Sequence, residues 1–137
     1  GAAVERLSYD EHSQEVSYIQ DLQSYTMRSL EHSSVPLIWN GKRSNTIPNN
    51  IHCSIPGIFA GDLMVYLDIH EIAISTGSAC HSGAWTPSHV MQALTSDEDR
   101  IQSAIRIGLL RSTTKAEIDR FIAYLEEFAT PKTDTQN

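Results

Sequence analysis

Two long helical patterns of apolar residues, one near each end of the chain, constrain the fold more than any other feature. Over residues 10–30 and again over residues 114–130, apolar side chains recur every three or four positions. Thr114 and Glu117 have the spacing of a capping box, and Pro131 is expected to end the second helix. Each helix therefore presents one apolar stripe that another element must cover. The two stripes are Val16, Ile19, Leu22, Met27 and Leu30, and Ile118, Phe121, Ile122, Leu125 and Phe128.

The middle of the chain contains shorter segments that alternate between strand and helix signals. Runs rich in β-branched or aromatic residues, bounded by glycine or proline, predict strands, and apolar residues at helical spacing predict short helices. This order predicts an α+β fold: a three- or four-stranded, largely antiparallel sheet with helices mainly on one side, the first and last helices among them. Residues 1–137 are expected to form one domain, frayed over 1–9 and 131–137. The predicted strands are 35–40, 50–55, 72–74 and 103–109, and the predicted short helices are 60–70, 86–94 and a third that starts near Ser96.

Composition excludes several classes of function. With 137 residues, 40% of them apolar, the chain has room for one hydrophobic core. A formal net charge of −7 argues against binding to nucleic acids or anionic membranes, because the basic residues are few and scattered. No apolar run reaches the roughly 20 residues of a membrane span, and no signal peptide is evident. We expect a cytoplasmic protein with free thiols.

Two cysteines occupy different kinds of segment. Cys80 lies in residues 75–85, STGSACHSGAW, which are small, polar and glycine-bearing and are typical of an exposed, mobile loop. Only a reachable thiolate acts as a nucleophile, and Cys80, followed by His81, meets the exposure condition. From spacing alone, an ordinary loop cysteine is the more common explanation. Cys53 falls within a predicted strand, where a buried structural thiol is the expectation.

Arg106 is the second candidate for chemistry. The strand pattern places Ile105 and Ile107 on one face and Arg106 on the other. A guanidinium there suits the bidentate binding of a carboxylate, although a surface ion pair is an open alternative. The pairs His52-Cys53 and Cys80-His81 lack the ligand spacing of zinc sites, so we expect no metal site.

Several segments, taken together and in order, resemble a known family. PNNIHCSIPG, IAISTGSAC, TPSHVMQAL and AIRIGLLRSTTKAEID are similar to the C-terminal small domain of pyridoxal-phosphate-dependent cysteine desulfurases, in the class V aminotransferase family. The resemblance runs from about residue 35 to residue 125. Its most specific part, residues 75–80, is similar to the SSGSAC loop of the group with a long, flexible cysteine loop. The sequence departs from the family pattern at His52, Thr76 and His81.

The resemblance implies a role for each candidate residue. Cys80 would take sulfur from L-cysteine as a persulfide, leave L-alanine, and pass the sulfur to an acceptor protein, as in iron-sulfur cluster assembly. Arg106 would bind the α-carboxylate of the substrate. The fold implied is that of the C-terminal domain in pyridoxal-phosphate enzymes of fold type I.

Family members hold pyridoxal phosphate through a lysine on a large domain that precedes this one. The lysines of this chain, Lys42, Lys115 and Lys132, have no such motif around them. We therefore expect the chain alone to bind no cofactor and to be near-inactive as an enzyme without that domain. The alternative is a stand-alone persulfide carrier or protein-binding module without enzymatic activity, and a homodimer is compatible with either.

Overall fold

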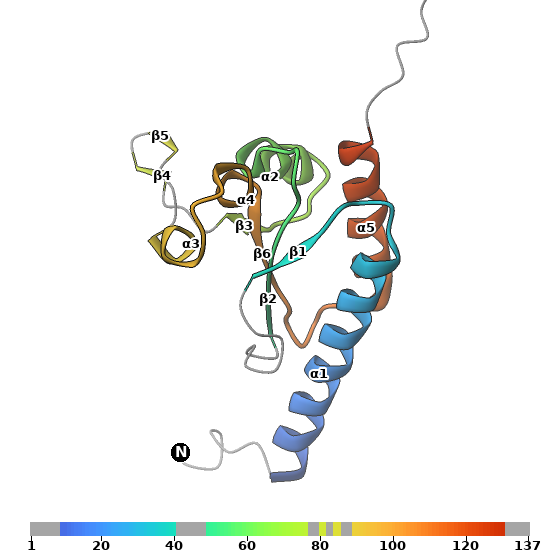
Figure 1. Cartoon of the computed structure of the whole chain (residues 1–137). Helices are drawn as coiled ribbons and strands as arrows, with labels where there is room; N and C mark the ends of the chain where they lie inside the picture. The colour runs from blue at the N-terminus through green and yellow to red at the C-terminus, as the bar shows by residue number, and fades with distance from the viewer. Residues whose placement is uncertain (1–8, 41–48, 77–79, 82–83, 86–88, 131–137) are drawn as a thin grey trace, which may run out of the picture.

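The computed structural model describes residues 9–40, 49–76, 80–81, 84–85 and 89–130. The helices and strands follow one another in an alternating order along the chain (Figure 1). They are α1 (Tyr9–His32), β1 (Ile38–Trp39), β2 (Asn50–Ser54), α2 (Ala60–Ile69), β3 (Ser75–Thr76), β4 (Cys80–His81), β5 (Ala84–Trp85), α3 (His89–Leu94), α4 (Glu98–Gln102), β6 (Ala104–Gly108) and α5 (Lys115–Ala129).

Four of the strands form one antiparallel sheet in the order β1-β2-β6-β3. The last strand in the sequence, β6, thus lies in the interior of the sheet between β2 and β3. Strands β4 and β5 form a separate two-stranded antiparallel pair. The predicted α+β fold with a four-stranded antiparallel sheet is confirmed.

Helices α1, α2 and α5 cover one face of this sheet. Figure 1 shows α1 and α5 lying side by side along the sheet, and both contribute to a single core with α2, β2 and β6. The predicted alternation in β6 explains which face is covered, because Ile105 and Ile107 are buried while Arg106 between them is exposed. In β2, Cys53 likewise points into the core. The opposite side of β2, β6 and β3, which carries Arg106, is called the open face below.

Side-chain bonds fix the helices in place. Thr114 and Glu117 form the predicted capping box at the start of α5. Helix α2 is tied to α5 by an aromatic contact, since the His70 ring stacks on Tyr124 with 4.0 Å between ring centres. Tyr66 in α2 adds a 2.5 Å hydrogen bond to the Glu127 carboxylate. These contacts hold the helical layer against the core side of the sheet.

The structure corrects the strand predicted at residues 72–74. After α2, the backbone turns at Glu71, which has a φ of 64°, and the Ile72 N–H donates to the Leu67 carbonyl over 2.9 Å. These residues end the helix instead of entering the sheet, and the strand begins at Ser75. Ile72 and Ile74 still pack against the core, which explains their apolar character.

Two other expectations need adjustment. The segment 75–85, expected to be a loop, contains strand β3 and the β4-β5 pair. The third short helix begins at Glu98 with Asp97 as its N-cap, whose carboxylate accepts from the Asp99 and Arg100 N–H groups. The predicted cap at Thr86-Pro87 lies outside the described residues. None of the described helices is both long and apolar enough to cross a membrane.

Candidate functional site

Arg106 lies at the centre of the open face. It stands in β6, with His52 of β2 as its partner on one side and Ser75 of β3 on the other. Side chains at directly paired positions of antiparallel strands have Cβ atoms about 4.5–5.5 Å apart. The three side chains therefore form a row across the sheet. Among the described residues, no hydrogen bond or ion pair engages the Arg106 guanidinium, so it is available for an anion.

His52 is held as a neutral ring beside this guanidinium. The side chain is half-buried, and burial lowers the pKa of His52 below its usual value, with the positive charges of Arg106 and Arg100 lowering it further. Its Nε2 atom is buried and has no hydrogen-bond partner among the described residues. A ring nitrogen in this state calls for an explanation, because buried polar atoms in proteins are nearly always paired.

Arg100, the second guanidinium near His52, serves a structural purpose. Its Nε donates to the Asn40 Oδ1 over 2.9 Å, and its terminal nitrogen donates to the Trp39 carbonyl over 3.4 Å. The Ser54 hydroxyl in turn donates to the Arg100 carbonyl over 2.7 Å, and it accepts from the Asn40 side chain. These bonds tie β1, β2 and the end of α4 together. No such bonds are made by the Arg106 side chain to the other described residues.

Next to this row, at Gly108, no side chain fills the open face. Gly108 pairs with Asn50, and a Cβ atom added at Gly108 would meet nothing within 4 Å. The Asn50 Oδ1 atom is buried and has no hydrogen-bond partner among the described residues. Within the described ranges, the open face thus combines the Arg106 guanidinium without a described partner, two unpaired polar atoms and open space at Gly108, which together suit a small anionic ligand.

Cys80 does not lie beside Arg106. It begins β4 and pairs with Trp85 of β5. Figure 1 places this two-stranded pair beyond α3, apart from the four-stranded sheet. The two residues predicted as a site therefore stand on separate sheets, and the role of each remains a prediction.

Cys53 behaves as a structural thiol, as predicted. Its side chain is 0% exposed, and burial raises the pKa of Cys53 to about 12. The thiolate form is therefore suppressed at neutral pH, and no nucleophilic role is open to it.

The described residues do not fit a pyridoxal phosphate Schiff base. The lysine among them, Lys115, lies exposed at the start of α5 with its Nζ 5.1 Å from the centre of the Tyr25 ring, on the helical side. Lys42 and Lys132 fall outside the described ranges. Within those ranges, no three His, Cys, Asp or Glu side chains gather as metal ligands.

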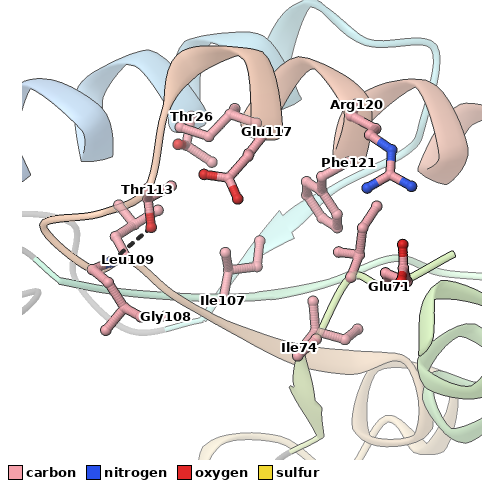
Figure 2. A pocket seen from close by; sticks show the side chains of 14 residues that line it. Thr26, Glu71, Ile74, Ile107, Gly108, Leu109, Thr113, Glu117, Arg120 and Phe121 are labelled. Atoms are coloured by element: carbon pink, nitrogen blue, oxygen red, sulfur yellow. Dashed lines mark hydrogen bonds between the residues drawn. The ribbon is translucent and has the colours of Figure 1, made fainter.

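A cavity of about 260 Å³ lies elsewhere, between α5 and the sheet (Figure 2). Isoleucine, leucine and phenylalanine side chains form half of its wall, which also includes Glu71, Glu117 and Arg120. Arg120 is already used, because it donates to the His70 carbonyl over 2.7 Å. The wall includes neither Arg106 nor Cys80, so the open face remains the candidate site.

Sequence reasoning found Arg106 and placed Gly108 on the same face of its strand, but it missed His52 and Asn50 as parts of that surface. The alternation of β2 indicates that Asn50 and His52 share a face. Their registration with Gly108 and Arg106 depends on how β2 and β6 pair, which no local pattern encodes.

Comparisons with known proteins agree on one family. The sequence model of the class-V aminotransferases matches residues 1–121. The cysteine desulfurase IscS of Dictyoglomus turgidum is 33% identical over 126 residues, covering 92% of this chain and 32% of the relative. The cysteine desulfurase NifS of Azotobacter vinelandii is 35% identical over 125 residues, covering 89% of this chain and 30% of the relative. The chain thus spans about a third of the length of these relatives.

Solved structures show the same likeness. The NifS-like protein from Rickettsia africae superposes with a TM-score of 0.72 at 26% identity, over 86% of this chain and 30% of that one.

Proposed function

The chain belongs to the class-V aminotransferase family, and from this premise we propose that it is the sulfur-accepting small domain of a cysteine desulfurase. One observation carries the proposal: the likeness to cysteine desulfurases spans about nine-tenths of the chain. The Arg106 guanidinium, which no other described residue engages, supports it, because the substrate of such an enzyme carries a carboxylate.

In this proposal Cys80 is the sulfur acceptor. Its thiolate attacks the sulfur of L-cysteine, so that an S–S bond forms and the C–S bond of the substrate breaks. The carbon that loses sulfur gains a proton, and the products are a Cys80 persulfide and L-alanine. Because the thiolate is the reactive form, a segment of small residues, which the sequence predicts to be exposed, is a suitable place for it.

Arg106 is proposed to bind the substrate α-carboxylate. A guanidinium makes two parallel hydrogen bonds to a carboxylate, which fixes the orientation of the amino acid as well as its position. Since Cys80 stands on a separate pair of strands, sulfur transfer requires the β4-β5 pair to approach the open face. The same mobility would carry the persulfide to an acceptor protein, for instance in iron-sulfur cluster assembly.

The proposal assigns no cofactor chemistry to this chain. Bound pyridoxal phosphate supplies the electron sink that labilises the C–S bond in such enzymes. The described residues offer no lysine on the open face, so the lysine-bearing domain is proposed to be a separate structural unit that meets this face. A reducing compartment such as the cytoplasm suits a thiol that must stay reduced.

The experiment measures alanine and sulfide formed from L-cysteine by the purified chain with pyridoxal phosphate and a reductant. We expect near-zero turnover from the chain alone, and turnover when a lysine-bearing large domain is added or fused. Cys80→Ala and Arg106→Ala should both abolish it, while Cys53→Ala should not. Turnover by the chain alone would show that it holds its own cofactor site. Failure of the fused protein, with both parts folded, would favour a carrier or binding module.

A further inference from the structure

His52 combines two properties that no purely structural role explains. Among the described residues, its Nε2 and the Asn50 Oδ1 are the buried side-chain atoms without a hydrogen-bond partner. His52 is also the direct strand partner of Arg106, whose guanidinium has no described partner either. An unpaired buried donor next to an unpaired cation indicates a shared ligand that completes both.

We propose that His52 is the second contact for the carboxylate that Arg106 binds, its Nε2–H donating to one carboxylate oxygen while the guanidinium donates to the other. This inference rests on the proposed function, since it names a further residue that selects the substrate. It places both donors on neighbouring strands of one rigid sheet, where the spacing between them is fixed by the β2-β6 register.

The electrostatics of the open face fit this arrangement. Burial is the main cause of the lowered pKa of His52. The described charged groups that lower it further are Arg106 on β6 and Arg100 in α4. Asn40, whose N–H donates to the His52 carbonyl, is neutral, and so is Ser75 on β3, on the far side of Arg106. A neutral imidazole donates a directional hydrogen bond without adding a third repelling cation.

Binding of an anion should therefore change the protonation of His52. A carboxylate in front of Arg106 offsets the positive charge that holds the His52 pKa down, so the pKa rises in the complex. By linkage, the carboxylate binds more tightly as the pH falls through the range in which His52 gains its proton. An uncharged analogue of the same size has neither effect, which makes the site selective for a free carboxylate.

The test uses the full 137-residue chain, labelled uniformly with 15N so that histidine ring, arginine side-chain and backbone amide signals can all be followed, and propionate as the probe. We expect the His52 ring signals to shift saturably on titration and the His52 pKa to rise. Propionamide, which lacks the charge, should leave both unchanged. In the Arg106→Gln variant the propionate response of His52 should disappear.

Variants at position 52 separate this role from a structural one. His52→Phe keeps the ring volume and removes the donor, so propionate should bind about tenfold more weakly or worse. His52→Gln places an amide nitrogen near the Nε2 position and should restore most of that loss. A merely structural His52 predicts equal propionate affinity in all three proteins. The wild-type pKa measurement stands even if one variant fails to fold.

The two proposals fail in different ways. A His52 signal that stays fixed while Arg106 responds to propionate, or no saturable response from either at tens of millimolar propionate, would overturn the His52 contact. Desulfurase activity of the fused protein is independent of that result. If the fused protein is inactive and propionate still shifts His52, the anion contact stands and the desulfurase assignment falls.

Discussion

Cys53 and Cys80 provide an internal comparison of thiol reactivity. Cys53 is fully buried, and its pKa is raised to about 12. At pH 8 only about one Cys53 in 10⁴ is a thiolate, whereas an exposed thiol with a pKa near 8.5 is about a quarter ionised. Ionisation alone thus predicts that Cys53 reacts at least about 10³-fold more slowly than an exposed thiol. Burial slows it further, because reagent must wait for an opening of the core.

The assay is alkylation by iodoacetamide, followed by mass spectrometry of the intact chain at pH 8. We expect one rapid label on the folded wild type, none on the folded Cys80→Ser variant, and two on the wild type in denaturant. The folded Cys53→Ala variant should label like the wild type. Labelling of folded Cys53 within tenfold of the rate of Cys80 would refute the burial on which the prediction rests.

Three further predictions follow from the described contacts. Thr114→Ala removes the side-chain cap of α5 and should lower the free energy of unfolding by about 1 kcal/mol in urea titrations, and an unchanged midpoint would contradict the capping role. Gly108 has no positive φ, and a Cβ atom there would meet open space, so Gly108→Ala should raise the free energy of unfolding by about 0.5 kcal/mol in the same titrations. The added methyl group enters the open face, so the variant should nevertheless reduce turnover of the fused enzyme. Because the pKa of His52 is lowered in the folded state, the unfolded chain takes up its proton at a higher pH, so the free energy of unfolding should fall as the pH drops below about 6.5. His52→Phe should reduce this loss of stability at acid pH in unfolding curves. An equal loss in the wild type and the variant would count against the lowered pKa.

The elements with strong periodic patterns could be predicted from the sequence. The stripe of α5 and its capping box depend on residues three or four positions apart, so local spacing determines them. The alternation of β6 placed Arg106 opposite Ile105 and Ile107 for the same reason. Burial of Cys53 followed from its strand position.

The remaining features depend on contacts between distant segments. Residues 72–74 have a strand-like composition, but the turn at Glu71 and the bond from Ile72 to Leu67 use their backbone to end α2. The neighbourhood of Arg106 and His52 arises from the β2-β6 register, which joins residues more than fifty positions apart. No local pattern contains that register, so His52 could be seen only in the folded chain.

The central claim is that Cys80 accepts sulfur from L-cysteine, and direct detection of its persulfide tests this best. The chain, fused to a lysine-bearing large domain, is mixed with L-cysteine and pyridoxal phosphate without reductant. Its thiols are then blocked, and its proteolytic peptides are analysed by mass spectrometry. The account predicts that the Cys80 peptide gains the mass of one sulfur atom, while the Cys53 peptide and the Arg106→Ala protein do not. Alanine formation with sulfur on another residue, or with an unmodified Cys80, would contradict it.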